Sequence, residues 1–270
     1  MSATEPIRVL ITGVCGRMGA LVTQTVNEAP DMLVVAGVDP AGIGHALSEF
    51  VPGADPELEV SGHLKGAIED HQPQVMVDFT APQVVMANVE TALSAGVACV
   101  VGTTGFSETD LQVVARLCQV KQTSAIVAPN FSLGAVLMMQ FSARAARLFD
   151  YAEIIEYHHE AKKDSPSGTA VKTAEMMAAA RQAAFAEPKT ELERVRGCRG
   201  GVGSGIHIHA VRMQGFVANQ EVILGGPGET LTLSHVTTSR ESFLPGIMLA
   251  IRTVREQHGL VYGLEHLLEM

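Results

Sequence analysis

Residues 7–19 read IRVLITGVCGRMG, and this stretch decides the fold of the first half of the chain. Residues 7–12 form a short apolar run rich in β-branched side chains, which predicts a buried strand. Glycines at positions 13, 16 and 19 follow at once, and apolar residues then recur at helical spacing. The order of strand, glycine turn and helix predicts the opening unit of a dinucleotide-binding α/β domain.

Each of these glycines has a structural use in a dinucleotide site. Gly13 permits a tight turn, Gly16 lets the backbone approach a pyrophosphate, and Gly19 lets the helix pack closely on the strand. Cys15 occupies the position of the usual middle glycine, so the spacing is GxxGxxG. A glycine pattern alone is weak evidence, but the strand before it and the helix after it strengthen it.

A second apolar strand is predicted over residues 32–38, and Asp39 follows it directly. A carboxylate at this place accepts hydrogen bonds from the adenosine ribose hydroxyls and repels a 2′-phosphate. Pro40 comes next, and no lysine or arginine occurs between Arg17 and Lys65. The sequence therefore predicts NADH as the cofactor, while Arg17 in the glycine turn leaves the use of NADPH open.

Strands and helices continue to alternate as far as residue 130. Strands are predicted over 75–80, 97–102 and 124–130, with a helix in each interval. Such alternation predicts a parallel sheet wrapped by helices, with ligands at the carboxyl ends of its strands. We expect three strand ends to contact the ribose and the nicotinamide carboxamide, although the same residue types are common in ordinary loops. These ends are Asp78 to Thr80, Gly102 to Gly105 and Ala128 to Phe131.

Residues 153–169 read EIIEYHHEAKKDSPSGT and concentrate the reactive side chains of the second half. A strand is predicted over 153–158, which places His158 and His159 at its end. Strong helix formers fill residues 169–186 and predict a helix there.

The turn before that helix is expected to bind an anion. Pro166 suits the first helical turn, with Asp164 or Ser165 as the cap. The first backbone N–H groups of a helix lack helical partners and lie at the positive end of its dipole. We expect three of them to face outward and bind a substrate carboxylate: those of Ser167, Gly168 and Thr169.

The remaining segments predict a second sheet and a return of the chain. Residues 132–149 predict a helix. The stretch 193–205 predicts a mobile loop with three arginines, which are expected to contact solvent and not the substrate. Residues 206–238 predict three long strands separated by glycine turns. A helix is predicted over 241–257 and a short terminal helix over 263–270.

These segments group into two expected domains. Residues 1–130 and 241–270 form a Rossmann-type dinucleotide-binding domain, and residues 131–240 form a mixed α/β domain for substrate binding and oligomerisation. The second domain carries a largely antiparallel sheet, whose exposed face favours self-association. His207 and His209 share one face of a strand, but no cysteine, aspartate or glutamate nearby in the sequence completes a metal site, so no metal is expected.

Composition narrows the class of protein further. The 270 residues carry a net charge of -10, which argues against binding of nucleic acid or an anionic membrane. Four scattered cysteines without CxxC spacing indicate a reducing, cytoplasmic setting. No apolar run approaches the roughly 20 residues of a membrane helix, and the first strand begins too early to leave room for a signal peptide.

The motifs together resemble the dihydrodipicolinate reductase (4-hydroxy-tetrahydrodipicolinate reductase) family of lysine and diaminopimelate biosynthesis. The resemblance runs nearly end to end, through VLITGVCGRMG, DFT, GTTGF, APNFS, EYHHEAKKDSPSGTA, HAVRMQGFVANQEVILGG and SRESFLPG. It implies hydride transfer from NAD(P)H to a small cyclic dicarboxylate imine, and a homotetramer joined through its sheets. Pro40 stands where some members have an arginine, which puts a strong NADPH preference in doubt.

The resemblance also implies roles for individual residues. His158 is the general acid and base and Lys162 the proton donor, while Lys163 falls outside the matched position and is unassigned. The substrate set that it implies is His159, Gly168 and Thr169, to which the exposed N–H groups predicted above add Ser167. The cofactor set is Gly13, Val14, Cys15, Gly16, Arg17, Met18, Asp39, Phe79, Gly102, Thr103, Thr104, Ala128, Pro129, Asn130 and Phe131.

Two other functions stay open from the sequence. A non-catalytic NAD(H)-sensing protein could share the glycine turn and acidic balance, but it would not need an imidazole and an ammonium beside an anion site. A different Rossmann-type reductase of the aspartate pathway is the nearer alternative. An aldehyde-phosphorylating enzyme would need a nucleophilic cysteine, and only Cys198 lies in the second domain, without an evident base.

Overall fold

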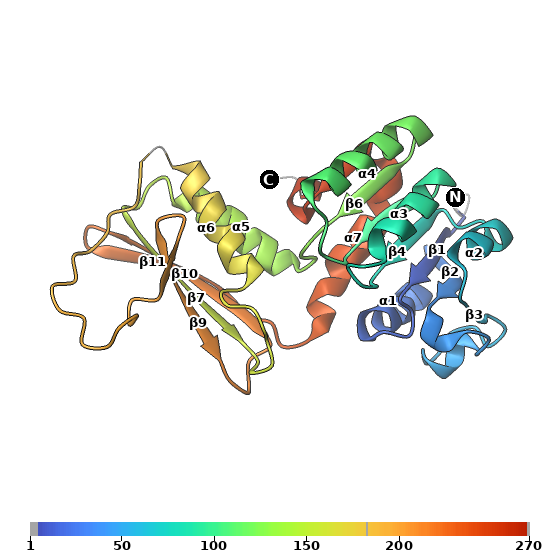
Figure 1. Cartoon of the computed structure of the whole chain (residues 1–270), viewed down its shortest axis with the longest axis horizontal. Helices are drawn as coiled ribbons and strands as arrows, with labels where there is room; N and C mark the ends of the chain where they lie inside the picture. Colours follow the sequence, from blue (N-terminus) through green and yellow to red (C-terminus); the bar gives the residue numbers. More distant parts are fainter. Residues whose placement is uncertain (1–4, 182, 269–270) are drawn as a thin grey trace. The chain divides into compact units, whose positions relative to one another are not determined.

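The structure is a computed structural model that describes residues 5–181 and 183–268. Its chain divides into two compact units. The first unit comprises Met1–Phe131 and Phe243–Met270, and the second comprises Ser132–Ser242. Each unit has its own sheet, shown in Figure 1.

The sheet of the first unit is parallel throughout and has the strand order β12-β6-β5-β4-β1-β2-β3. Chain order begins at the centre of the sheet and proceeds to both edges, which is the doubly wound arrangement. The strands are β1 (Ile7–Thr12), β2 (Met32–Val38), β3 (Val60–Ser61), β4 (Val75–Asp78), β5 (Ala98–Val101), β6 (Ser124–Val127) and β12 (Gly259–Tyr262).

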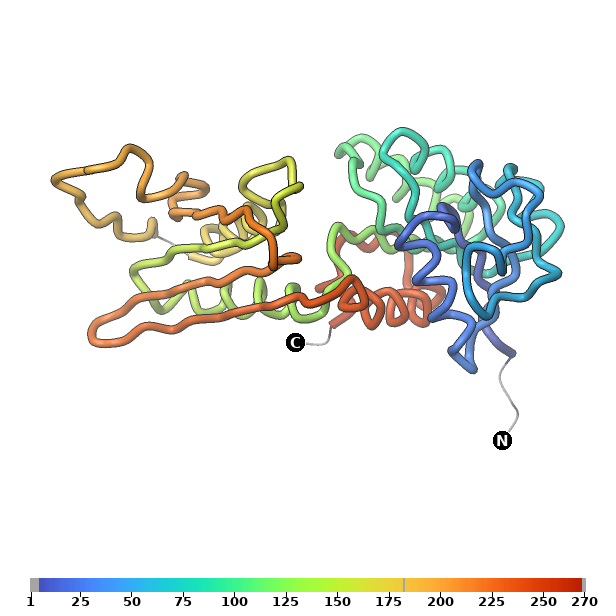
Figure 2. The backbone as a smooth tube through the Cα atoms, turned by 90° about the horizontal axis from the view of Figure 1, so that it is seen from below, coloured from blue at the N-terminus to red at the C-terminus, as the bar shows by residue number. Residues whose placement is uncertain are grey.

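Helices cover the two faces of this sheet. Alternate strand residues, among them Leu10, Met76 and Cys99, share one buried cluster with residues of α2, α3 and α4. Helices α1 and α7 contact each other, and Figure 2 shows their blue and red segments together, apart from the cyan and green of α3 and α4. The helices are α1 (Arg17–Glu28), α2 (Leu64–His71), α3 (Val85–Ser94), α4 (Glu108–Lys121) and α7 (Leu244–Thr253).

The sheet of the second unit is mixed and has the order β11-β10-β7-β9-β8. Three of its pairings are antiparallel and one, between β7 and β9, is parallel. Helices α5 (Leu133–Ala145) and α6 (Gly168–Ala180) pack against each other and contact this sheet. Its strands are β7 (Tyr151–His158), β8 (Gly201–Gly203), β9 (Ile206–Arg212), β10 (Ala218–Gly226) and β11 (Glu229–His235). The predicted fold class is confirmed.

Several predicted boundaries were wrong. The helix predicted over 169–186 ends at Ala180, and Arg181 is extended. Arg181 donates to the carbonyls of Ala146 and Phe149 and stacks over Phe185, so tertiary contacts override the helical propensity of the following alanines. Residue 182 lies outside the described residues.

Two short edge strands were not predicted. Strand β3 has two residues, and β12 forms where the chain returns from α7 and pairs with β6. The predicted loop 193–205 contains β8, which pairs with β9. The terminal segment has a 3₁₀ helix over Leu264–Leu267, while residues 269 and 270 lie outside the described part.

Gly19 shows how tightly α1 packs on the glycine turn. A Cβ atom added at Gly19 would lie 2.0 Å from the carbonyl oxygen of Gly13 and 2.9 Å from the Cα of Val14. Both neighbours are backbone, so the helix itself would have to move. We therefore expect Gly19→Ala to lower the free energy of unfolding by about 1–3 kcal/mol, measured by urea denaturation.

Gly66 provides the matched control. It lies inside α2, and a Cβ atom there would meet nothing within 4 Å. Because alanine reduces the entropy of the unfolded chain, Gly66→Ala should raise the free energy of unfolding by about 0.5–1 kcal/mol. Equal losses in the two variants would contradict the role of close packing at Gly19.

Candidate functional site

The glycine turn has the backbone geometry that its sequence predicts. Gly13 has a φ of 76°, in the region that favours glycine, and its N–H donates to the carbonyl of Val38 (2.9 Å). A Cβ atom at Gly13 would lie 2.4 Å from the carbonyl oxygen of Phe79. Gly16 caps the N-terminus of α1, whose first residue is the exposed Arg17. The turn therefore presents backbone and a helix N-terminus, as a pyrophosphate site requires.

Asp39 lies at the end of β2 and ties the glycine turn to it. Its carboxylate accepts from the N–H of Cys15 (3.1 Å) and from that of Ala41 (2.9 Å). Burial, and then the nearby Asp39 charge, raise the pKa of the Cys15 thiol to about 11. Cys15 is therefore a neutral thiol at physiological pH, suited to packing and not to redox chemistry.

Asp78 organises the carboxyl ends of the neighbouring strands. Its carboxylate is fully buried and accepts hydrogen bonds from five donors. Two come from the hydroxyl groups of Thr12 and Thr103 (2.7 Å each), which belong to different strand ends. The others are the N–H of Thr80 (3.1 Å), the hydroxyl of Thr80 (2.8 Å) and the side-chain amide of Asn88 (2.9 Å). The sequence identified Asp78 only as the polar end of a strand.

Several residues predicted at the cofactor meet at this edge of the first unit. The Phe79 ring lies against Gly102, where a Cβ atom would be 2.1 Å from it, and its centroid is 6.2 Å from that of Phe131. A shallow hollow lies next to them, lined by Thr103, Thr104, Gly105, Phe106, Val127, Pro129 and Tyr262. Tyr262 belongs to β12 and was missed, because it joins the site only through the pairing of β12 with β6.

Buried side chains restrict how some of these residues can act. Val14, Ala128 and Phe131 are buried as whole residues, so their side chains pack inside the protein and do not face a ligand. The hydroxyl of Thr103 donates to Asp78 and accepts from the N–H of Thr80 (2.8 Å), so it holds the loop in place.

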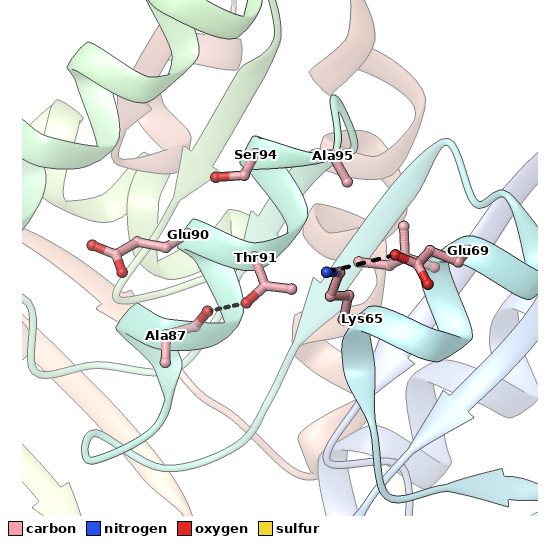
Figure 3. Close-up of a pocket in the computed structure, with 8 residues that line it drawn as sticks. Lys65, Glu69, Ala87, Glu90, Thr91, Ser94 and Ala95 are labelled. Carbon is pink, nitrogen blue, oxygen red and sulfur yellow. Dashed lines mark hydrogen bonds and ion pairs between the residues drawn. The ribbon is translucent and has the colours of Figure 1, made fainter.

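Another hollow of the first unit lies between α2 and α3, with a volume of about 600 Å³ (Figure 3). Its lining residues belong to these two helices and to Ala95 just beyond α3. Lys65 pairs with Glu69 (3.8 Å), and the Thr91 hydroxyl donates to the carbonyl of Ala87 (2.7 Å). The predicted cofactor residues lie instead on loops that follow strands, so this hollow is separate from them in the fold.

In the second unit, His158 ends β7 and contacts a carboxylate from the same strand. Its Nδ1 lies 2.5 Å from Oε2 of Glu156, which is fully buried. Arg212 of β9 donates to both oxygens of Glu156, at 2.7 Å each. The N–H of Ser167 donates to Oε1 of Glu156 (3.1 Å). Glu156 and Arg212 were not predicted as site residues, because the pair that they form joins strands 56 residues apart in the sequence.

The turn before α6 departs from its prediction in three respects. Pro166 lies before the helix, which begins at Gly168, and not in its first turn. Neither Asp164 nor Ser165 caps the helix: Ser167 does so, and its hydroxyl accepts from the N–H of Ala170 (3.2 Å). Ser167 is buried and its own N–H is taken by Glu156, so the prediction that this N–H faces outward was wrong. Gly168 and Thr169, the first two residues of α6, remain the predicted substrate contacts.

Lys162 lies between the histidines and this turn. Its ammonium group pairs with both oxygens of Asp164, at 2.8 and 3.0 Å, and is largely buried. His159 follows β7 directly and is half-buried. An imidazole, an ammonium group and a helix N-terminus therefore occur within one short segment of the second unit.

The charges around His158 set its protonation. Burial lowers the pKa of the His158 imidazole, against the opposing effect of Glu156. Burial alone raises the pKa of Glu156, but the hydrogen bonds from Arg212 and His158 outweigh it and bring the pKa below its usual range. At neutral pH the site therefore holds a neutral imidazole beside an ionised carboxylate.

Within residues 5–181 and 183–268, the structure has no group of three or more histidine, cysteine or acidic residues placed to hold a metal ion. Among the helices that the structure describes, none is both long and apolar enough to cross a membrane.

Comparisons with known proteins cover nearly the whole chain. A family model described as "Dihydrodipicolinate reductase, N-terminus" matches residues 7–131, and one described as "Dihydrodipicolinate reductase, C-terminus" matches residues 134–268. A protein of Moorella thermoacetica named 4-hydroxy-tetrahydrodipicolinate reductase is 48% identical over 97% of this chain and 98% of its own length. A protein of the same name from Thermosynechococcus vestitus is 43% identical over 98% of each chain.

Solved structures agree with this similarity. The dipicolinate-bound dihydrodipicolinate reductase of Paenisporosarcina sp. TG-14 is 42% identical and covers 97% of this chain and all of its own, with a TM-score of 0.88. The amine dehydrogenase of Mycobacterium smegmatis is 14% identical, covers 94% of each chain and has a TM-score of 0.64, so it shares the fold alone.

Proposed function

This chain belongs to the dihydrodipicolinate reductase family, and from that membership we propose that it reduces 4-hydroxy-tetrahydrodipicolinate to tetrahydrodipicolinate with NADH. It is an oxidoreductase of lysine and diaminopimelate biosynthesis. The observation that carries the proposal is the segment 158–169, where an imidazole and an ammonium group precede the N-terminus of α6. A non-catalytic nucleotide sensor has no use for this combination.

The residues of the first unit fit a nicotinamide dinucleotide. Gly16 leaves exposed backbone at the start of α1, and the buried Gly13 makes the turn before it, where a Cβ atom would meet the carbonyl of Phe79. Asp39 is available for ribose hydroxyls, because each carboxylate oxygen can accept more than the one hydrogen bond it has. The loops that contain Phe79, Gly102 to Thr104 and Ala128 to Phe131 are also assigned to cofactor binding.

The reduced dinucleotide, when bound, supplies the hydride, and the 4-hydroxyl group of the substrate leaves as water before or during this reduction. The chain's own residues then have three tasks, all in the second unit. Gly168 and Thr169 bind one substrate carboxylate at the start of α6, and His159 contacts the same molecule. Lys162 delivers a proton to the ring as negative charge builds on it. A dianionic substrate raises the pKa of His158 on binding, so the imidazole can share that proton.

We also propose that NADH is preferred over NADPH. Asp39 repels a 2′-phosphate, and Pro40 supplies no cation to offset it. One spectrophotometric experiment tests activity and preference together: the condensation product of pyruvate and aspartate semialdehyde, freshly made, is mixed with the protein and each nucleotide. Absence of oxidation with both nucleotides would overturn the proposed activity, and faster oxidation of NADPH would overturn only the preference.

The second unit is further proposed to join four chains into a homotetramer. Large apolar side chains on or beside its sheet are exposed, among them Val202, Met213, Leu231 and Val236. An exposed apolar sheet surface of this kind is normally covered by another copy. Sedimentation equilibrium should give four times the chain mass, and a monomer at micromolar concentration would refute the assembly.

A further inference from the structure

Glu156 is a buried carboxylate whose hydrogen-bond partners come from β7, from β9 and from the turn before α6. It receives two bonds from Arg212, one from the N–H of Ser167, and it contacts Nδ1 of His158. Burying a charge is costly unless it is fully paired, so a carboxylate this deep indicates a defined task. The proposed reaction assigns no task to Glu156.

The contact with His158 determines which imidazole nitrogen faces the substrate. A carboxylate can only accept, so Nδ1 must carry the proton that it shares with Glu156. Nε2 is then the nitrogen left to exchange a proton with a substrate. The contact between Nδ1 and Oε2 of Glu156 therefore fixes both the tautomer and the orientation of the ring.

The contact with Ser167 extends this control to the anion-binding turn. Ser167 caps α6, and Gly168 and Thr169 follow it as the first two helical residues. Since Oε1 of Glu156 holds the N–H of Ser167, the same carboxylate fixes the start of the helix and the imidazole. Arg212 clamps both oxygens of Glu156 and also donates to the carbonyl of Asp164 (2.8 Å).

We propose that Glu156, clamped by Arg212, is a positioning residue that sets the tautomer of His158 and aligns it with the first turn of α6. This inference rests on the proposed reductase function, because it concerns how His158 and the substrate turn act in that reaction. Glu156 itself does not contact the reacting atoms.

The opposite face of β7 offers a matched control. Glu153 contacts Nε2 of His209 (2.8 Å) and Nη2 of Arg199 (2.7 Å), so it too lies between a histidine and an arginine. Glu153 is about one-third exposed, whereas Glu156 is fully buried. Glu153→Gln removes the same charge from the same strand without touching the proposed site.

The wild-type protein tests the tautomer without any variant. Protein labelled with ¹⁵N-histidine should show His158 protonated at Nδ1 near pH 7, with its signals assigned by their loss in His158→Gln. A neutral His158 protonated at Nε2 would overturn the proposal. Because this measurement uses the unaltered chain, it remains decisive even if variants at Glu156 fail to fold.

Glu156→Gln tests the consequence for catalysis. The groups that act on His158 are Glu156 from its own strand, Lys162 from the following turn and Arg212 from β9. Glu156 raises the His158 pKa and the two cations lower it, so Glu156→Gln should move that pKa further down. We expect kcat to fall about 100-fold and KM for the substrate to rise, with KM for NADH unchanged.

The outcomes separate this inference from the proposed function. If the wild-type protein oxidises no nucleotide with substrate, the proposed function fails, yet the tautomer measurement still stands. If the wild-type protein is active and Glu156→Gln keeps its kcat and its His158 pKa, the positioning role fails. Equal losses in Glu153→Gln and Glu156→Gln would also overturn it, because the effect would then be a general one of charge.

Discussion

Lys162→Ala and His158→Ala should each lower kcat by about 10²- to 10⁴-fold, the range for loss of a positioned proton donor or acceptor. Lys162 supplies a proton and a positive charge as hydride arrives, and His158 shares the proton through its ring. Both residues lie in the second unit, whereas the residues assigned to the cofactor lie in the first. The Kd for NADH, measured by fluorescence titration, should therefore stay unchanged in both variants.

Lys163 supplies the control for this experiment. It is adjacent to Lys162 in the sequence and carries the same charge, but its side chain is exposed. Lys163→Ala should keep the wild-type kcat. If Lys163→Ala and Lys162→Ala lose equal activity, the reaction depends on the positive charge of the segment. The role of Lys162 as proton donor would then be wrong. Parallel loss of NADH binding would likewise contradict the assigned roles.

The pH dependence of the reaction follows from the same site. Burial lowers the pKa of His158, so the free enzyme carries a neutral imidazole at neutral pH. A bound dicarboxylate opposes this shift, because its negative charge stabilises the imidazolium. The pKa that appears in the profile of kcat should therefore lie above the one in the profile of kcat/KM, which reports the free enzyme.

Local signals in the sequence were sufficient for the first sheet. The glycine turn at 13–19 and the β-branched runs predict their conformation from nearby residues alone. For this reason β1, α1, β2, β4, β5 and β6 were predicted. Strands β3 and β12 were missed because they are short and depend on partners far along the chain. Their pairing is a tertiary property that no local pattern records.

The same distinction divides the candidate site. His158, Lys162 and Gly168 lie in one short segment and could be identified together. Glu156 was adjacent to that segment but appeared to be an ordinary strand residue, because Arg212 is 56 residues away in the sequence. The start of α6 was misplaced for a related reason: Glu156 holds the N–H of Ser167, which makes Ser167 the cap.

Asp78 is a second buried carboxylate whose hydrogen bonds could not be predicted from the sequence. We expect its removal to lower the stability of the first unit more than any other single substitution there. Thr12 is 66 residues away from it in the sequence and Thr103 is 25 away, so the donors converge only after β1, β4 and β5 have paired. Asp78→Ala would leave the buried hydroxyls of Thr12 and Thr103, and the part-buried donors of Thr80 and Asn88, without their acceptor. Because each unsatisfied buried group costs about 1–3 kcal/mol, we expect the free energy of unfolding to fall by about 4 kcal/mol.

Asp110 separates burial from hydrogen bonding in this experiment. Its carboxylate accepts from the N–H of Ser107 (2.8 Å) and from the hydroxyl of Ser107 (2.7 Å), but it is exposed at the start of α4. Water can replace the lost acceptor there, so Asp110→Ala should lower the free energy of unfolding much less than Asp78→Ala does. Urea denaturation of both variants measures the difference. Similar losses would show that the buried network at Asp78 adds no stability beyond that of exposed hydrogen bonds. Asp78 would then not be what holds the strand ends with Phe79 and Thr103 in place.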